Sequence, residues 1–229
     1  VAAHLALQVV QEGFLAGKWN SAVGTPTTDL RSLYEPAAGL IEAAGGSIQM
    51  GTRALGIAYD GIRTTGVVTQ EGMVNSTAVI AAIPPDRLEN LVSLPMRSAD
   101  HRLRGLDKFT FSPIVGVHMF FKDRIMTRNG QRLAHLILPG RKTHWLFDKG
   151  RDEKGLYHVH AVISAADDWV TLEEEEIAAR VLQDIHWALP SARGLEPVEI
   201  RSIKERRATF RATPEIDALR PSIEPGISR

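Results

Sequence analysis

Five histidines are the residues of this chain whose types and spacing best suit chemistry. His158 and His160 lie two positions apart in a predicted strand, so their side chains point to the same face. His118, His135 and His144 fall on strands that we expect to be neighbours. Such a cluster is either a zinc site with an open position or the polar wall of a solvated sheet face or wet cavity. No Asp or Glu lies on those strands with ligand spacing, so we predict no metal.

Four cations form a basic cluster near the C-terminal end: Lys204, Arg206, Arg207 and Arg211. On a strand, Lys204 and Arg206 share one face, and the other two share the opposite face. The chain has 27 Lys and Arg against 27 Asp and Glu, and this zero net charge argues against a nucleic-acid partner. We interpret the cluster as a surface feature, with salt bridges or binding of an anionic cofactor as alternatives.

Aromatic residues are expected on the same strands as the histidines. Phe120, Trp145 and Phe147 are candidates for the lining of a large apolar pocket, which suits a hydrophobic ligand. Ordinary core packing is the alternative interpretation for each of them.

Missing residues and motifs exclude several classes of protein. The chain has no cysteine, so disulfides, thiolate metal ligands and a cysteine nucleophile are excluded. It contains no G-x-S-x-G, H-E-x-x-H, P-loop or G-x-G-x-x-G motif. No apolar run approaches the ~20 residues of a membrane span, and no signal peptide is recognisable. We therefore expect a cytoplasmic protein.

Helical spacing of apolar residues predicts five helices, which together with the strands must position the histidines, cations and aromatic residues. Their ranges are 1–17, 30–46, 86–93, 96–106 and 171–188. Asp29 is the expected N-cap of the second helix, which either kinks or begins at Pro36. In the last helix, Thr171 and Glu174 are expected to form a capping box. We favour core packing for helix 1–17, with peripheral docking on the inner face of the cytoplasmic membrane as the alternative.

Short β-rich segments predict the strands: 47–50, 54–59, 62–69, 73–83, 114–121, 132–138, 144–147, 157–164 and 198–203. Asp60-Gly61 is a strong signal for a two-residue hairpin turn. Sequential short strands favour antiparallel pairing, so the fold class is α+β with a mixed, largely antiparallel sheet and flanking helices. The strand over 73–83 ends at Pro84-Pro85, because proline cannot donate to a sheet ladder.

Several sequence blocks, in order, carry a resemblance to a known family. The first block is GGSIQMGTRALGIAYDGIRTTGVVTQEGMVNSTAVIAAIPP. It resembles a segment of the flavin-dependent amine oxidase and phytoene desaturase superfamily. The other blocks are EGFLAGKWNSAVGTPTTDLRSLY, FSPIVGVHMFF, HWLFDKG, VISAADDW and KERRATFRATP. These resemble the squalene-associated FAD-dependent desaturases, the branch that includes the hydroxysqualene dehydroxylases.

The departures from the family pattern concern its two ends. Members begin with a G-x-G-x-x-G turn for the FAD pyrophosphate and end with a G-D block after a P-G-[IL] turn. This chain has neither block and breaks off at Pro225-Gly226-Ile227. We therefore expect a central fragment of such an enzyme, which alone is inactive and does not retain FAD.

The resemblance also implies a division of the chain by function. Segments 1–28 and 86–204 are expected to form a substrate-binding domain. Segment 29–85 is expected to be the inner helix, strand and β-meander of an FAD-binding domain. Segment 205–229 is expected to return toward the missing C-terminal FAD block. Pro84-Pro85 then marks a crossing between domains.

The resemblance implies two sets of cofactor contacts. The backbone around Arg53, Ala54 and Leu55 is expected to face the adenine end of FAD. The turn of Ala82, Ile83 and Pro84 is expected to lie near the cofactor. The family typically has Val where Ala54 stands, so packing against adenine would be weaker while a backbone contact would survive.

The implied reaction is removal of the hydroxyl group from hydroxysqualene with reduced FAD, or desaturation of a related polyene. The implied partner is an apolar isoprenoid substrate. His118, His158 and His160 are candidates for the proton donor, if their strand face lines the pocket. The alternative function is a stand-alone lipid- or isoprenoid-binding module without redox activity. Nothing in the sequence sets the oligomeric state.

Overall fold

The computed structural model describes residues 2–24, 26, 28 and 30–221. The chain divides by its internal contacts into two units, Val1–Phe109 with Ala212–Arg229, and Thr110–Arg211. The expected N-cap at Asp29 and the expected turn at 225–227 lie outside the described residues.

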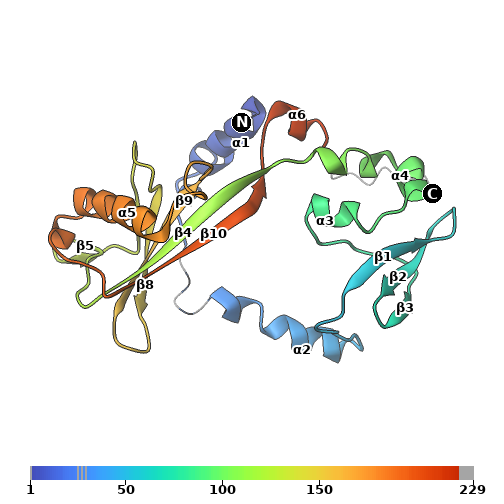
Figure 1. Ribbon diagram of the computed structural model, residues 1–229, viewed down its shortest axis with the longest axis horizontal. Helices are drawn as coiled ribbons and strands as arrows, with labels where there is room; N and C mark the ends of the chain where they lie inside the picture. Colours follow the sequence, from blue (N-terminus) through green and yellow to red (C-terminus); the bar gives the residue numbers. More distant parts are fainter. Residues whose placement is uncertain (1, 25, 27, 29, 222–229) are drawn as a thin grey trace. The chain divides into compact units, whose positions relative to one another are not determined.

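In the first unit, the helix near the N-terminus lies beside a segment from the C-terminal part of the chain. Helix α1 (Ala3–Val10) continues as a π-helical turn over Gln11–Leu15, so the predicted helix over 1–17 is confirmed in its main part. The core packing that we favoured for it is wrong for the described residues, because neither α1 nor this turn contains a buried residue. Beside α1 lies α6 (Pro214–Asp217) (Figure 1). The Ala2 N–H donates to the Ala212 carbonyl at 2.8 Å, and His4 Nε2 lies 3.0 Å from the Asp217 carboxylate.

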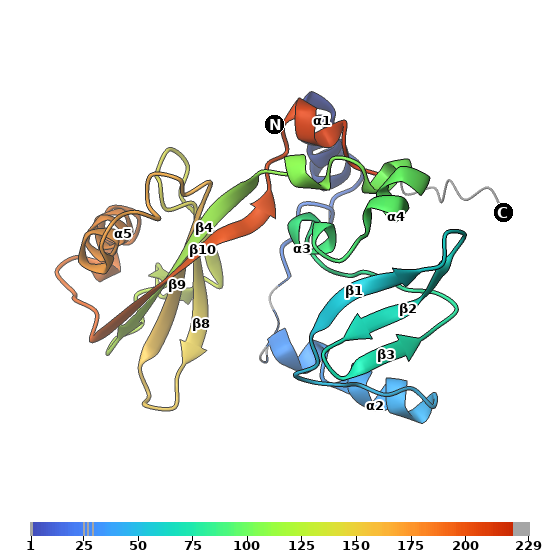
Figure 2. The same ribbon diagram turned by 45° about the vertical axis from the view of Figure 1, so that its right-hand side comes forward.

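The first unit also contains a three-stranded antiparallel sheet of β1 (Ala54–Tyr59), β2 (Thr64–Thr69) and β3 (Gly72–Asn75) (Figure 2). The predicted hairpin is confirmed, but its turn is longer than the two residues expected: Tyr59 pairs with Thr64, so the strand expected over 62–69 begins at Thr64. In the turn, Asp60 Oδ1 accepts from the N–H groups of Ile62 and Arg63, both at 2.9 Å. Gly61 has a φ of 101°, which glycine adopts without strain.

Two strand predictions in this unit are wrong. The strand expected over 73–83 ends at Asn75, and residues 77–83 form neither helix nor strand. Pairing of β3 with β2 ends there because β2 itself begins at Thr64. The last hydrogen bond of the pair runs from the Ser76 N–H to the Thr65 carbonyl, so no β2 residue is left to pair with residues 78–83. Residues 47–50 also form no strand, since no described strand pairs with them.

Short helices complete the first unit. They are a 3-10 turn (Leu30–Leu33), α2 (Pro36–Ala43), α3 (Pro85–Glu89), α4 (Leu94–Ala99) and 3-10 turns at His101–Leu103 and Leu106–Lys108. Helix α2 begins at Pro36, which fits one of the two expected positions. The helix expected over 96–106 is shorter because Asp100 leaves the helical conformation and its carboxylate caps the next turn.

The segment after Pro84 packs on β1 in a small core. Val92, Met96 and Leu106 are buried there against Ile57 and Leu88. The Ile57 N–H donates to the Leu91 carbonyl at 2.8 Å. By contacts, the first unit extends as far as Phe109, whereas the division by function at 28, 85 and 204 stays a prediction.

The second unit is built on a five-stranded antiparallel sheet in the order β10-β4-β9-β8-β7. Its strands are β4 (Phe111–Phe121), β7 (His135–Ile137), β8 (Trp145–Arg151), β9 (Tyr157–Ser164) and β10 (Glu199–Phe210). The strand predicted over 157–164 has the observed bounds, and the one predicted over 198–203 extends to Phe210. A separate hairpin joins β5 (Thr127–Arg128) and β6 (Gln131–Arg132). The α+β class is therefore confirmed.

Helix α5 (Glu174–Ala188) packs on this sheet and is followed by a 3-10 turn at Pro190–Ala192 (Figure 1). Its fully buried residues Ile177, Val181 and Ile185 follow the predicted stripe. The predicted capping box is wrong, because Glu173 is the N-cap and makes no side-chain cap bond. Glu174 Oε1 instead accepts from the N–H and hydroxyl of Ser202 on β10, at 2.5 and 3.0 Å.

Candidate functional site

The five-stranded sheet has two chemically different faces. Alternate residues of β4 and β9, among them Val117 and Ala161, are completely buried in the core that includes α5. The residues between them are only partly buried and carry the imidazole and aromatic side chains. This alternation follows from the two-residue repeat of a strand, which sends successive side chains to opposite faces.

A single cross-strand row brings five of these residues together, one from each strand. In order across the sheet they are Arg201, His118, His160, Phe147 and His135. The parallel row on one side pairs Phe120 with His158, and the row on the other side pairs Gly116 with Val162 and Trp145. We name the group His118, His158 and His160 the histidine cluster.

The histidine cluster is held by one hydrogen bond and by stacking. His118 Nδ1 and His158 Nε2 lie 2.8 Å apart, so one ring donates to the other. His118 and His160 stack with centroids 4.2 Å apart and an interplanar angle of 4°. Phe120 stacks on His158 at 4.6 Å. Each imidazole therefore has a fixed neighbour on a different strand.

Gly116 makes room for the His160 ring. A Cβ atom placed at Gly116 would lie 2.9 Å from His160 Nε2, closer than van der Waals contact allows. Sequence reasoning missed this glycine, although its position two residues before His118 in the same strand indicates the same face.

The aromatic residues extend the row toward the far edge of the sheet. Trp145 and Phe147 stack at 5.6 Å, and Phe147 lies 6.4 Å from His160. His135 lies 5.9 Å from Trp145, and among the described residues its buried Nδ1 has no hydrogen-bond partner. The expected pocket residues Phe120, Trp145 and Phe147 therefore lie on the same face as the histidine cluster, whereas their role as pocket lining stays a prediction.

Burial lowers the pKa of the histidine cluster, because a charged imidazole loses hydration there. Burial is the largest cause at both His158 and His160, His118 and Lys149 add to it at both, and His158 adds to it at His160, so that each pKa is lowered to about 4. For His118, burial, Lys149 and Arg201 lower the pKa as well. The cluster is therefore neutral at pH 7.

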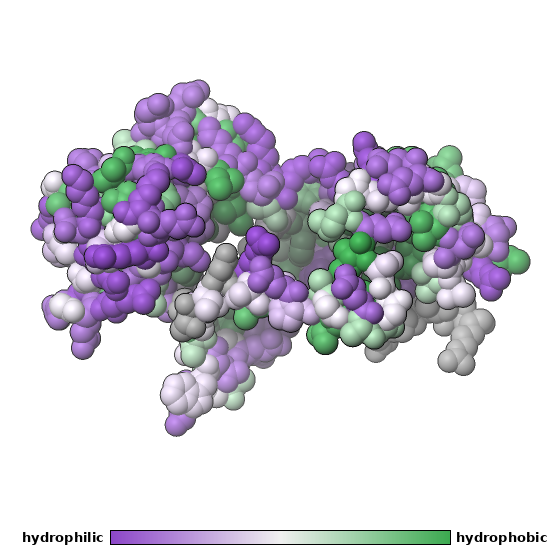
Figure 3. Space-filling view, turned by 90° about the horizontal axis from the view of Figure 1, so that it is seen from below, coloured by the Kyte–Doolittle hydropathy of each residue, from purple (hydrophilic) through white to green (hydrophobic). Residues whose placement is uncertain are grey.

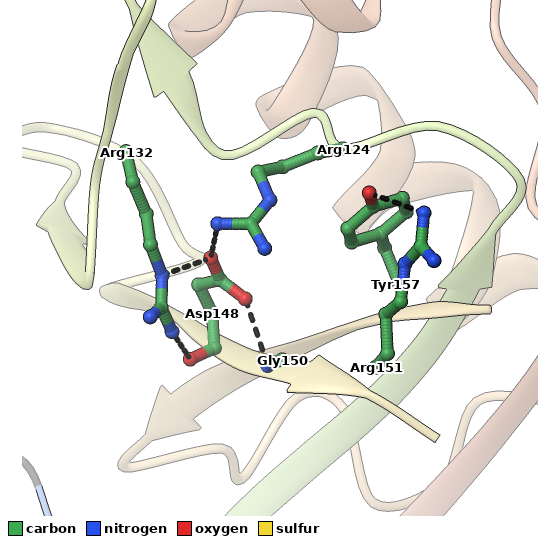
Figure 4. A network of polar contacts seen from close by, with 6 residues as sticks. All are labelled: Arg124, Arg132, Asp148, Gly150, Arg151 and Tyr157. Carbon is green, nitrogen blue, oxygen red and sulfur yellow. Dashed lines mark hydrogen bonds and ion pairs between the residues drawn. The ribbon is translucent and has the colours of Figure 1, made fainter. Parts of the chain in front are cut away.

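A polar network stabilises β8 near the site (Figure 4). The Asp148 side chain is 2% exposed, and its Oδ2 accepts from Arg132 Nε at 2.7 Å and lies 3.5 Å from Arg124. Its Oδ1 accepts from the Gly150 N–H at 2.8 Å, next to a register shift between β8 and β9. Arg151 donates to the Tyr157 hydroxyl at 2.7 Å. The network holds the irregular end of β8 in place.

The residues expected to contact the cofactor belong to the first unit. Arg53 directly precedes β1, and Ala54 and Leu55 open it, with Leu55 51% exposed. Ala82 and Ile83 lie in the exposed segment before α3, which is neither helix nor strand, and Pro84 is the N-cap of that helix. Exposed backbone of this kind can offer N–H and C=O groups to a cofactor, so these positions suit backbone contacts.

The basic cluster is engaged within the second unit. Lys204 and Arg206 donate to the carbonyls of Leu172 and Val170, which confirms that they share one side of the strand. Arg207 lies over the Phe111 ring at 4.4 Å, and Arg211 pairs with Asp167. The ion pair of Arg211 with Asp167 supports the salt-bridge alternative.

Residues 2–24, 26, 28 and 30–221 contain no group of three or more His, Asp or Glu arranged to hold a metal ion. No helix of that part of the chain is long and apolar enough to cross a bilayer.

His144, one of the five histidines, accepts from the Ser164 N–H at 3.1 Å and lies outside the histidine cluster.

Comparison with solved structures places the fold. The chain superposes on reduced UDP-galactopyranose mutase with a TM-score of 0.61 and 12% identity, over 81% of this chain and 40% of that one. It superposes on putrescine oxidase bound to putrescine with a TM-score of 0.56 and 19% identity, over 70% and 36%. A putative protoporphyrinogen oxidase from Exiguobacterium sp. 255-15 gives 0.54 and 18%, over 79% and 39%.

Comparison of sequences identifies the family. A hydroxysqualene dehydroxylase of Sinorhizobium fredii (strain NBRC 101917 / NGR234) is 27% identical over 221 residues. The match covers 96% of this chain and 48% of that protein, so the chain spans about half the length of this relative. The model of the family described as flavin containing amine oxidoreductase matches residues 12–229. The chain therefore belongs to the flavin containing amine oxidoreductase family.

Proposed function

We propose that the chain is the central part of an FAD-dependent oxidoreductase that acts on a squalene- or carotenoid-type isoprenoid. Family membership supports the flavin chemistry, and the relative named hydroxysqualene dehydroxylase supports the isoprenoid. The observation that carries the substrate class is the sheet face on which neutral imidazoles stand among Phe120, Phe147 and Trp145.

This face suits an apolar chain with few polar groups. Aromatic side chains supply large apolar contact area, which favours contact with hydrocarbon over contact with water. The neutral histidine cluster adds hydrogen-bonding groups without a formal charge. A charged group at this place would lose its hydration under an apolar ligand, at a high cost in free energy. Apolar side chains also reach the molecular surface in several places (Figure 3). Phe14 and Leu15 are exposed apolar residues of the N-terminal helical segment, which supports peripheral contact with a membrane holding the substrate.

The residues at the start of β1 and those leading into α3 would hold the flavin through backbone contacts, with Arg53, Ala54 and Leu55 at the adenine end and Ala82, Ile83 and Pro84 also near the cofactor. When bound, the flavin supplies hydride transfer to or from the substrate. In this proposal, segments 1–28 and 86–204 bind and orient the isoprenoid, and the sheet face excludes water from it. His118, His158 or His160 would move the proton that accompanies loss of a hydroxyl group.

The full-length protein tests this proposal. We expect it to purify with a flavin spectrum, and hydroxysqualene added without oxygen to its reduced form should reoxidise the flavin and yield squalene. If the reaction is desaturation, electrons should flow the other way: a more saturated isoprenoid should reduce the oxidised flavin and so bleach its spectrum. An apolar amine is the matched control and should change neither spectrum. Flavin turnover with the amine and with no isoprenoid would overturn the proposal.

A further inference from the structure

One cavity of the second unit is lined mainly by cations. It has a volume of about 330 Å³ and is formed by the turn between β7 and β8 together with residues of α5. Its lining includes Arg141, Lys142, Trp169, Arg180, Gln183 and Asp184. Because α5 packs on the buried face of the sheet and the histidine cluster occupies the other face, the cavity is separate from that cluster.

The turn before β8 presents two of the cations. A hydrogen bond from the Arg141 N–H to the Leu138 carbonyl, at 3.2 Å, closes the turn. Pro139 and Gly140 are its central residues, and the Gly140 φ of 74° is the left-handed value that a type II turn requires. Arg141 and Lys142 follow directly, so a tight turn determines where their side chains start.

Asp184 connects this turn to α5. Its buried carboxylate accepts from the Thr143 N–H at 3.1 Å and lies 3.5 Å from Arg141 Nη1. The Arg141 guanidinium also lies over the Trp187 ring, 4.2 Å from its centroid. Arg180 is four residues before Asp184 in α5, so the two share one side of the helix. The cavity is therefore formed in the free protein, which lowers the free energy needed to order it around a ligand.

The charge of the lining favours a doubly charged anion. Three cations and one carboxylate, that of Asp184, line the cavity, which gives the lining a net charge of +2. Lys142 is exposed and forms no ion pair with the part of the chain that the structure describes. Arg180 pairs with Glu176 at 2.6 Å, but both side chains are about half exposed, and such a pair contributes little.

We propose that this cavity binds the phosphate group of a phosphate monoester. Such a group carries a charge of about −1.5 to −2 at pH 7, and its oxygens accept hydrogen bonds from guanidinium groups in pairs. The monoester is either a soluble compound or the headgroup of an acidic lipid, because both present the same anion. The site goes beyond the proposed function, since it requires neither flavin nor isoprenoid.

Binding to the 229-residue chain tests the proposal. Isothermal titration calorimetry at low ionic strength, where screening of exposed charges is small, measures the dissociation constants of glycerol phosphate and of glycerate. We expect glycerol phosphate to bind about tenfold more tightly, because glycerate has a similar size but a single charge. Co-sedimentation with phosphatidylcholine vesicles, with and without phosphatidic acid, tests the lipid headgroup.

The variant Lys142→Gln removes one charge at an exposed position, so the fold should be retained. It should weaken binding of the phosphate probe about tenfold, the value of one hydrogen bond to a charged group. The matched control is Lys108→Gln, which removes an exposed lysine of the first unit and should leave binding unchanged.

The two probes distinguish the sources of the phosphate. Binding of glycerol phosphate alone would assign a soluble ligand, and binding of phosphatidic acid vesicles alone would assign a lipid headgroup; either result supports the site. Binding of neither probe, equal affinity for glycerate, or equal affinity in wild type and Lys142→Gln would overturn the proposal.

Discussion

His118 Nδ1 and His158 Nε2 lie 2.8 Å apart, although their residues are separated by 40 positions in the sequence and come from different strands. Antiparallel pairing of β4 with β9 sets His118 opposite His160 and Phe120 opposite His158. The hydrogen bond therefore runs diagonally across two neighbouring pairs. An N–H···N bond of this kind requires that one of the two facing nitrogens carries a proton and that the other is an unprotonated acceptor, so the two rings cannot both be charged.

Acid should destabilise the second unit through the histidine cluster. The unfolded chain binds protons at its histidines near pH 6.5, whereas the folded chain does so only near the pKa of about 4 of His158 and His160. Between these values the unfolded state binds more protons, so the free energy of unfolding falls as the pH falls. The part of the stability that depends on neutral His158 and His160 is fully present above pH 6.5 and is lost as the pH falls toward 4.

Urea denaturation at intervals from pH 7.5 to 4.5 measures this loss. Lys149 and Arg201 oppose protonation of the cluster, and Asp148 and Asp152 favour it at His158. The double variant His158→Phe/His160→Phe removes both titrations and should show a flatter profile between pH 6.5 and 5. Equal slopes for variant and wild type would contradict the prediction.

Gly116→Ala should destabilise the chain by about 1 kcal/mol, because the new methyl group would crowd the stacked His160 ring. Thermal or urea denaturation measures the change. In the His160→Ala background the same substitution should cost nothing, since alanine is otherwise favoured over glycine in a strand. A double-mutant cycle with no coupling would show that the two residues do not interact.

Asp148→Asn should lower the free energy of unfolding by about 2 kcal/mol, because it removes the charge that two arginines share. The matched control is Asp167→Asn, which breaks the exposed pair with Arg211 and should cost less than about 0.5 kcal/mol. Equal losses in the two variants would mean that burial of the Asp148 side chain has no effect on its contribution.

Glu174→Ala should destabilise the chain by about 1 kcal/mol, since it removes the acceptor for the Ser202 N–H and hydroxyl. Glu175→Ala lies in the same first turn of α5 and should change stability by less than about 0.5 kcal/mol. Hydrogen exchange at the Ser202 amide provides a local measurement. Unchanged protection of that amide in Glu174→Ala would contradict the assigned contact.

The sequence predicted much of the fold because its local signals agree with the final structure. The alternation in 157–164 predicts a strand with one polar and one apolar face, and β9 has those bounds and faces. The apolar residues predicted to form one face of α5, such as Ile177, Val181 and Ile185, are likewise buried. The strand expected over 73–83 failed because an apolar run satisfies the local pattern, whereas a strand also needs a paired neighbour, and pairing ends at Asn75.

The capping box failed for a related reason. Thr171 and Glu174 have the required spacing, but Glu174 forms a stronger set of contacts with Ser202, 28 residues away. Local patterns count only the contacts available within one turn. A partner from another strand competes for the same carboxylate, and no local pattern includes it.

By itself, the sequence determined which residues share a strand face and which family the blocks resemble, because both depend on short-range spacing and residue type. Only the tertiary structure decided which strands are neighbours, and therefore that His118 pairs with His160, bonds to His158 and requires glycine at 116. The register of one strand against another depends on contacts between residues far apart in sequence. Spacing along a single strand does not contain that information.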